Sequence, residues 1–309
     1  MISIILTSLS CISSNSSFTE CVRKDNTKGN SHIHFNSVEM PTCTINGTLY
    51  TDILCNTSST NSLANKASYV FASCEWNRCT AGSGGAISTS AQINLTLDNC
   101  KLLSCKANSK SGGGIYVNGA SIVHMTNCLF KSCEALTNPD ANDGGGAMCI
   151  LSVTTEVFIS HTDILSCTVT KDGGGIIMRS CLSTLGLDCS FLDCKVISCK
   201  GTSGQEGGGL ILWGNDYSLV MSEMVISDCS NYFGGGLQHS CPGTPTLSPV
   251  QFSFFHANSA TCGKDAYIDH IVVYSSSLPF FLHSFSSGTG TGNVQQYRSN
   301  EYLDNWLFQ

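Results

Sequence analysis

Charged residues are scarce in this sequence: Asp, Glu, Lys and Arg make up 12% of the 309 residues, about half the usual share. Lys and Arg number 15 against 22 acids, for a formal net charge of −7. A nucleic-acid-binding surface requires clustered Lys and Arg, so the composition argues against that class of partner. No run reaches the roughly 18 apolar residues of a membrane span, and no segment combines a helical period with caps.

Residues that could form a catalytic site are few and dispersed. Glycoside hydrolysis needs two carboxylates at a defined separation, and the eight histidines form no cluster. His161-Thr162-Asp163 comes nearest to a catalytic run, but it lies where other repeats have core or corner residues. No glycine run precedes the Lys-Ser or Lys-Thr of a phosphate-binding loop. The sequence predicts no catalytic residue and no cofactor-binding residue, and we expect no enzyme activity.

Glycine is abundant instead, and it recurs in a fixed pattern. A glycine pair, a third small residue and then an aliphatic residue or alanine occur six times, at residues 84–87, 112–115, 144–147, 173–176, 207–210 and 234–237. The spacing of about 30 residues is typical of a solenoid. Glycine suits a tight corner because it accepts positive φ and lets backbones approach closely.

Cysteines mark the other part of each repeat. Pairs with four residues between them are Cys74/Cys79, Cys100/Cys105, Cys128/Cys133 and Cys194/Cys199, and two further repeats keep only the second member, Cys167 and Cys229. A bulky residue lies three positions before the second member: Trp76, Leu102, Phe130, Ile164, Val196, Ile226 and Phe255. Segments such as 93–97 alternate apolar and polar residues as strands do. The sequence therefore predicts an all-β fold, a single parallel β-helix of about seven coils with irregular terminal segments.

Equivalent residues in such coils stack about 4.8 Å apart, so the second cysteines would form a row on the inner wall. A buried cysteine behaves as a small apolar residue, and in-register Cβ atoms are slightly too distant for a relaxed disulfide. Two interpretations are open: an internal ladder of reduced thiols, or cross-linked coils. No matching histidines accompany the cysteines, which argues against zinc.

We divide the chain into residues 1–68, a signal segment plus an N-terminal cap or degenerate coils; residues 69–268, the repeats; and residues 269–309, a C-terminal cap or tail. Met1 to Ser13 is apolar enough for a short signal but lacks a leading Lys or Arg. Two alternatives stay open here: whether this segment is cleaved, and whether the chain is a fragment of a longer protein.

Two elements of the repeat resemble a known family. Gly84-Gly85-Ala86-Ile87 matches the Gly-Gly-Ala-Ile element of the polymorphic outer-membrane protein repeat, and Phe255-His256-Ala257-Asn258 matches its Phe-x-x-Asn element. Phe130-Lys131-Ser132-Cys133 matches the second with cysteine in place of asparagine. The resemblance covers about two thirds of the chain. It implies a right-handed parallel β-helix of the pectate-lyase-like class, as in cysteine-rich protist surface proteins, and an adhesive or surface role.

An acidic row precedes three of the glycine turns: Asp143, Asp172 and Glu206. Acids on successive coils would lie about one strand spacing apart, where like charges are unfavourable. A calcium ion would relieve that repulsion. The alternative is that the three side chains diverge into solvent from loops of unequal length.

A second row concerns partners. If the aliphatic residue after each glycine turn points inward, the next residue points outward, and four of these are apolar: Tyr116, Met148, Ile177 and Ile211. A contiguous exposed apolar row marks a contact or is covered by another segment. We expect either coverage by a terminal segment or a binding face for a protein or glycan.

These observations favour a monomeric, non-enzymatic, extracellular or cell-surface protein that acts in adhesion, scaffolding or display, with a protein or glycan partner. A carbohydrate-active β-helical enzyme with an unrecognised site is the alternative, and an ectodomain fragment of a larger receptor-like protein is a third.

Overall fold

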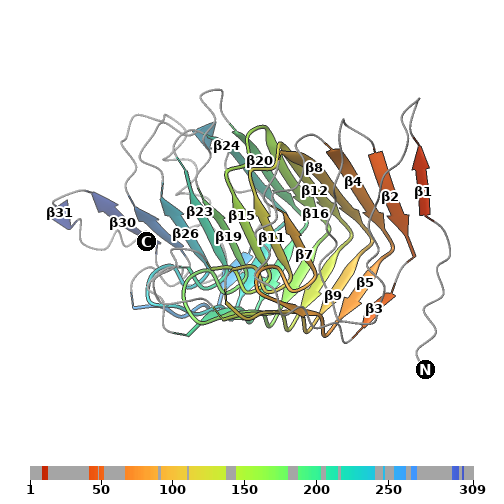
Figure 1. Cartoon of the computed structure of the whole chain (residues 1–309). Coiled ribbons are helices and arrows are strands. Elements are labelled where there is room, and N and C mark those ends of the chain that lie inside the picture. The colour runs from red at the N-terminus through yellow and green to blue at the C-terminus, as the bar shows by residue number, and fades with distance from the viewer. Residues whose placement is uncertain are drawn as a thin grey trace.

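The computed structural model describes residues 9–12, 42–47, 49–51, 67–89, 92–109, 111–136, 144–179, 187–202, 207–214, 217–240, 246–247, 254–261, 266–269, 294–298 and 301–302. Every regular element among them is a strand, and the strands stack side by side into a solenoid (Figure 1). The described part of the chain contains no helix that is long and apolar enough to cross a membrane. The predicted signal lies mostly outside these residues, as does the Gly/Thr/Ser-rich run from Ser286 to Asn293.

A complete coil contributes one strand to each of four sheets, named here the first to the fourth sheet in the order in which the chain enters them. The first sheet consists of β1 (Leu9–Ile12), β2 (Thr42–Asn46), β4 (Ala67–Ala72), β8 (Ile93–Asp98), β12 (Ile122–Thr126), β16 (Glu156–Ser160), β20 (Leu187–Leu192), β24 (Tyr217–Ser222) and β27 (Thr246–Leu247). The second consists of β3 (Leu49–Thr51), β5 (Glu75–Asn77), β9 (Lys101–Leu103), β13 (Leu129–Lys131), β17 (Asp163–Leu165), β21 (Lys195–Ile197), β25 (Val225–Ser227) and β28 (Phe254–His256).

The other two sheets flank the glycine turns. The third consists of the short strands β6 (Thr80–Ala81), β10 (Lys106–Ala107), β14 (Glu134–Ala135), β18 (Thr168–Val169) and β22 (Lys200–Gly201). The fourth consists of β7 (Ile87–Thr89), β11 (Ile115–Asn118), β15 (Met148–Leu151), β19 (Ile176–Arg179), β23 (Leu210–Trp213), β26 (Leu237–Ser240), β29 (Ala266–Asp269), β30 (Val294–Arg298) and β31 (Glu301–Tyr302). Among the described strands, pairing between coils is parallel, and the pairs β1–β2 and β30–β31 are antiparallel.

The parallel solenoid confirms the predicted fold class, with a small difference in the number of coils. Five coils contribute a strand to all four sheets, since the third sheet has five strands. The next two coils extend the third sheet only by the single bridges Lys200–Ser230 and Ser230–Ser259. The five complete coils are therefore fewer than the predicted seven, because the shortest strand is lost first toward the C-terminal end.

Alternation along the strands fills the lumen with apolar side chains. In β8 the residues at 93, 95 and 97 are buried, and those between them are half-buried or exposed. The predicted row of bulky residues lies inside, from Trp76 through Phe130, both fully buried, to Phe255, which is 7% exposed. Register links Trp76 to Leu102 and Leu102 to Phe130, so equivalent residues stack as predicted.

Two tight corners per coil turn the chain from the first sheet to the second and from the second to the third. A single non-glycine residue at each corner has φ between 47° and 56°, as at Asn99 and Ser104 in the coil that begins with β8. This left-handed conformation reverses the direction of the chain within one residue. The next residue then points into the lumen, and in most coils that residue is a cysteine.

The glycine turns join the third sheet to the fourth. Gly145 has φ +82°, and a Cβ atom there would lie 2.0 Å from the carbonyl oxygen of Met148. At Gly113 a Cβ atom would lie 2.1 Å from the Gly146 oxygen and 2.6 Å from the backbone of Glu134, on the third sheet. The turn therefore needs one glycine for its dihedral angle and another for the close approach of two backbones.

The hydrogen bonds between coils align the third glycine turn with the other turns one residue later than predicted. This alignment is called the frame of the turn. Ile115 is in register with Met148, not with Ala147, and Gly114 donates to the Ala147 oxygen at 2.9 Å. Gly145 is thus equivalent to Gly112, and Gly144 precedes the turn. Three successive glycines followed by alanine fit two frames, and only the pairing between coils distinguishes them.

Candidate functional site

Ten cysteines form two stacked rows on the inner side of the two tight corners. The twelve cysteines whose side chains the structure describes, these ten with Cys149 and Cys189, are all buried and are not joined in disulfides. The row predicted from the sequence, Cys79, Cys105, Cys133, Cys167, Cys199 and Cys229, lies at the corner between the second and third sheets. The position of this row agrees with the sequence-based prediction.

The thiols bond carbonyl groups of the preceding coil. Sγ of Cys133 donates to the Leu102 oxygen at 3.4 Å, and Sγ of Cys229 donates to the Val196 oxygen at 3.4 Å. Asn258 ends the row: its Nδ2 donates to the equivalent oxygen, that of Ile226, at 3.0 Å, and its Oδ1 accepts from the Cys229 backbone N–H at 3.0 Å. Cysteine and asparagine therefore satisfy the same backbone carbonyl position in different coils.

Burial and contacts between neighbouring thiols shift the pKa values of these cysteines in both directions: the hydrogen bond with Cys105 lowers the pKa of Cys133. Desolvation raises the pKa of Cys194 to about 11 and raises the pKa of Cys167 well above its ordinary value. A thiol must lose its proton to act as a nucleophile or metal ligand. No group of three or more His, Cys, Asp or Glu within the described ranges has the geometry to hold a metal ion. The rows are therefore structural.

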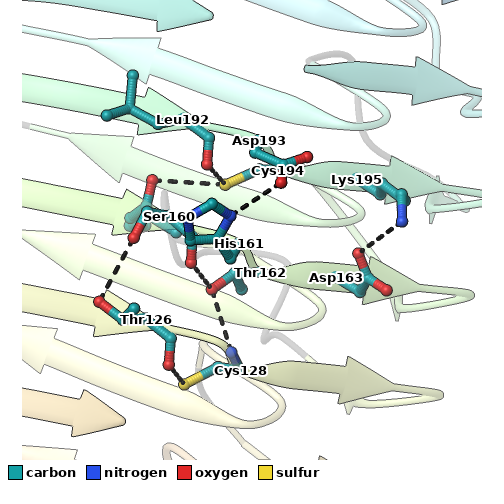
Figure 2. A network of polar contacts seen from close by, with 11 residues as sticks. Thr126, Cys128, Ser160, His161, Thr162, Asp163, Leu192, Asp193, Cys194 and Lys195 are labelled. Atoms are coloured by element: carbon teal, nitrogen blue, oxygen red, sulfur yellow. Dashed lines mark hydrogen bonds and ion pairs between the residues drawn. The ribbon is translucent and has the colours of Figure 1, made fainter. Parts of the chain in front are cut away.

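The run 161–163 occupies one corner between the first and second sheets (Figure 2). His161 has φ 47°, is exposed, and its Nδ1 lies 2.8 Å from Oδ2 of Asp193 on the next coil. Thr162 takes the inward position that cysteine has in other coils; its hydroxyl donates to the Ser160 oxygen at 2.8 Å and accepts from the Cys128 N–H at 3.4 Å. The corner interpretation of this run agrees with its geometry.

Asp163 points outward on the second sheet, and its Oδ1 lies 3.7 Å from Nζ of Lys195 (Figure 2). Both contacts connect one coil to the next: His161–Asp193 starts from the corner before β17, and Asp163–Lys195 starts from β17 itself. All four side chains are at least 39% exposed, so solvent screens them and each pair contributes little to stability.

The predicted calcium row is not assembled as expected. Asp172 is 6% exposed, and its Oδ2 lies 3.6 Å from the guanidinium of Arg179. In the frame set by the hydrogen bonds, Gly144 rather than Asp143 is equivalent to Asp172, because Gly145 donates to the Asp172 oxygen at 3.0 Å. Asp143 and Glu206 lie outside the described residues. Arg179 pairs with the charge of Asp172. The row as a whole stays a prediction.

The predicted exposed apolar stripe is also wrong. Met148 is fully buried and points into the lumen, because the shifted frame places it in register with Ile115. Cys149 takes the outward position instead. Ile177 and Ile211 do point away from the lumen, but both are fully buried and form a separate cluster with Cys149, against which Tyr116 and Leu151 pack.

Part of the cover over this cluster comes from the turns themselves. A Cβ atom at Gly207 would lie 2.2 Å from Cγ1 of Ile211, and one at Gly173 would lie 3.0 Å from Cβ of Ile177. The isoleucine side chains therefore fold back over the glycine turns. The absence of side chains at these glycines creates the space, an effect that alternation along the strand does not reveal.

Sequence reasoning missed a charged group on the outer side of the fourth sheet. Arg179 is 7% exposed, and its guanidinium carbon lies 4.6 Å from the ring centroid of Trp213, which is 39% exposed. Register places Arg179 opposite Trp213 on the next strand. An arginine between an aspartate and an indole ring has both its charge and its flat face occupied. The sequence has few arginines, and the presence of one at position 179 was the only signal that could have pointed to this group.

A second missed group lies inside the lumen. His239 is fully buried on β26, and its Nε2 bonds the hydroxyl of Tyr217, which is 2% exposed. Burial lowers the pKa of His239 to about 4. In the alignment of the repeats this residue falls two positions after the inward aliphatic residue Leu237, so alternation would have placed it inside.

Comparison with known proteins agrees with this architecture. Residues 84–263, more than half of the chain, match the family model described as right-handed beta helix region. The chain belongs to this family. Neither the curated proteins nor the solved structures gave a match. The family establishes the right-handed parallel β-helix and does not distinguish enzymes from binding proteins, because function resides in particular sites and not in the fold.

Proposed function

We propose that this right-handed β-helix is a non-enzymatic surface or secreted protein that acts in adhesion, scaffolding or display. The observation that carries the proposal is the arrangement of its outer charges. Lys106 bonds Glu134 at 2.8 Å and His124 contacts Glu156 at 2.9 Å. With the two pairs of Figure 2, four ion or hydrogen-bonded pairs each connect one coil to the next.

Charges arranged in this way differ from those of a hydrolytic site. Acid-catalysed glycoside cleavage requires two carboxylates that face one bond, one of them protonated. Here Glu134, Asp163 and Asp193 each contact a different basic or imidazole group. The pairs tie neighbouring coils together on the outer side of three different sheets, so each forms part of an extended β surface. Such a surface suits a protein or an extended glycan better than a small molecule, which requires a concave pocket.

The resemblance to the polymorphic outer-membrane protein repeat supports an extracellular or cell-surface location. Its two elements have clear structural roles in this chain: Gly84 has φ +53° in the turn, and Asn258 bonds the backbone of the preceding coil. We expect a protein or glycan partner. Because Asp172 already contacts Arg179, we expect binding without calcium or any other cofactor.

An enzyme of carbohydrates is the second candidate, and one observation favours it. His161 and Asp193 form an exposed, hydrogen-bonded pair beside Asp163, the nearest approach to a catalytic base and its orienting group among the described residues. This candidate would place chemistry on the outer side of the corner drawn in Figure 2.

A glycan array and a polysaccharide depolymerisation screen on the same purified chain distinguish the two candidates. We expect binding to a glycan or to a cell-surface protein fraction that persists in EDTA, with no shortening of any polysaccharide. The matched variant His161→Ala should bind equally well. Depolymerisation by the native chain that is lost in His161→Ala, with an unchanged circular dichroism spectrum, would overturn the proposal in favour of the enzyme.

A further inference from the structure

A titratable side chain lies in the lumen at a position that is apolar in the four preceding coils. His239 is in register with Leu212, and through successive strands with Met178, Ile150 and Val117. These four aliphatic or thioether side chains are at most 2% exposed, and His239 is fully buried. The solenoid therefore places one imidazole in a column of hydrocarbon, near the C-terminal end of the described coils (Figure 1).

The hydrogen bond to Tyr217 fits the neutral form of this imidazole. A phenol retains its proton at neutral pH, so a neutral imidazole can accept at Nε2 from the Tyr217 hydroxyl. The two ring centroids lie 5.6 Å apart. A protonated imidazole carries N–H groups on both nitrogens and no longer accepts this bond. Protonation would therefore reverse the polarity of the contact and put a positive charge in the lumen.

The strands packed around His239 bring few ionisable groups. β23 presents Leu210 and Leu212 inward, and β24 presents Tyr217 and Leu219. On β29 the register partner of His239 is Ile268, and Asp269 pairs with Ser240. A hydrogen bond to backbone favours the charged form, but desolvation outweighs it and lowers the pKa of His239 to about 4.

We propose that His239 is an acid-sensitive latch: its protonation opens the C-terminal coils from β26 onward, while the coils between β4 and β20 remain closed. The latch is local because each coil contacts only its neighbours, so coils near an end can open without the rest. Two other histidines in the described coils, His124 and His161, lie on the outer faces beside Glu156 and Asp193. His256 ends β28, in the coil that follows β26.

The sign and size of the effect follow from linkage. The opened state exposes His239 with an ordinary pKa near 6.5, whereas the closed state holds it near 4. Between these values the opened state binds more protons, so closure is fully favoured above about pH 6.5 and weakens as the pH falls toward 4. The opening equilibrium should rise about thirtyfold between about pH 7.5 and about pH 5.

Hydrogen–deuterium exchange on the full chain tests this latch, with rates corrected for the intrinsic pH dependence. We expect protection of β26 and β28 to fall about thirtyfold more than protection of β8 and β12 over that pH range. In His239→Leu, which copies Leu212 of the preceding coil, the difference between the two ends should vanish. His239→Gln, which keeps a polar partner for Tyr217 without a titrating group, provides the same test if the leucine variant does not fold.

Two results would overturn the proposal. One is equal loss of protection in N-terminal and C-terminal coils of the native chain at about pH 5. The other is a local, pH-dependent opening that persists in a folded His239→Leu or His239→Gln variant. Tyr217→Phe serves as the matched control: it removes the hydrogen bond but keeps the titrating imidazole, so its pH-dependent opening should remain.

Discussion

At the scale of single residues, cysteine in this protein acts as an inward-facing hydrogen-bonding group. Cys133 and Cys229 donate to the carbonyl groups of Leu102 and Val196, and Asn258 bonds the equivalent carbonyl one coil later. A small side chain with a weak donor fits a narrow corner in which a carbonyl would otherwise be unsatisfied. This explains why cysteine recurs at these corners.

Thiol accessibility tests that role. Iodoacetamide should leave the twelve described cysteines unmodified in the native chain and should modify them after denaturation in urea, because each is buried. Mass spectrometry of peptides, under non-reducing conditions, gives the readout. A disulfide between Cys105 and Cys133, or between any two members of their row, would contradict the thiol ladder and support cross-linked coils.

Glycines within one turn differ in what they require. Gly145→Ala should destabilise the fold by more than about 2 kcal/mol, because alanine disfavours a positive φ and its Cβ would overlap the Met148 oxygen. Gly114→Ala is the matched control: its nearest contact is 3.0 Å, and Ala86 and Ala147 occupy the equivalent position in other coils. Urea denaturation measures both, and equal losses would contradict the assignment of Gly145 as the left-handed glycine.

At the scale of elements, the middle of the fourth sheet differs from the other sheets because outward side chains there are buried, as at Cys149, Ile177 and Ile211. Along β19 all four residues from Ile176 to Arg179 are buried, whereas the first-sheet strand β8 alternates. Simple alternation assigns Ile177 to the outer face correctly but cannot give its exposure. Whether an outward side chain meets solvent depends on what lies over it, and here part of that cover is the glycine turn.

Substitution of the outward isoleucines follows from this difference. Ile177→Asp should destabilise the protein by several kcal/mol or prevent folding, since it buries a carboxylate in an apolar cluster. The control Ser190→Asp places the same charge on the outer side of β20, where the side chain is half-buried, and should change stability by less than about 1 kcal/mol. Thermal denaturation compares them; a folded, stable Ile177→Asp would restore the exposed stripe.

At the scale of the whole molecule, the coils behave as interchangeable layers. Each strand pairs only with the strands of the coils before and after it, and His124 is in register with Phe158. Stability in such an array is approximately a sum of coil and interface contributions. Removing one coil should therefore shorten the solenoid without disrupting it.

A deletion of residues 124–157 tests this view, because it joins Val123 to Phe158 in register. The shortened chain should keep a β-rich circular dichroism spectrum and unfold cooperatively at a lower urea concentration. Deletion of residues 124–136 alone removes half a coil, interrupts three sheets and should abolish the cooperative transition. Equal behaviour of the two deletions would contradict the layered organisation.

The sequence by itself determined the solenoid, the inner position of the bulky and cysteine rows, and the corner role of residues 161–163. Those features depend on periodicity and alternation, which are local properties of the chain. Only the tertiary structure decided the frame of the third glycine turn, the neutralisation of Asp172 by Arg179 and the burial of Ile177 and Ile211. Each of these depends on which backbone or side chain lies opposite in a neighbouring coil, or over a glycine, and a repeat pattern carries no information about that contact.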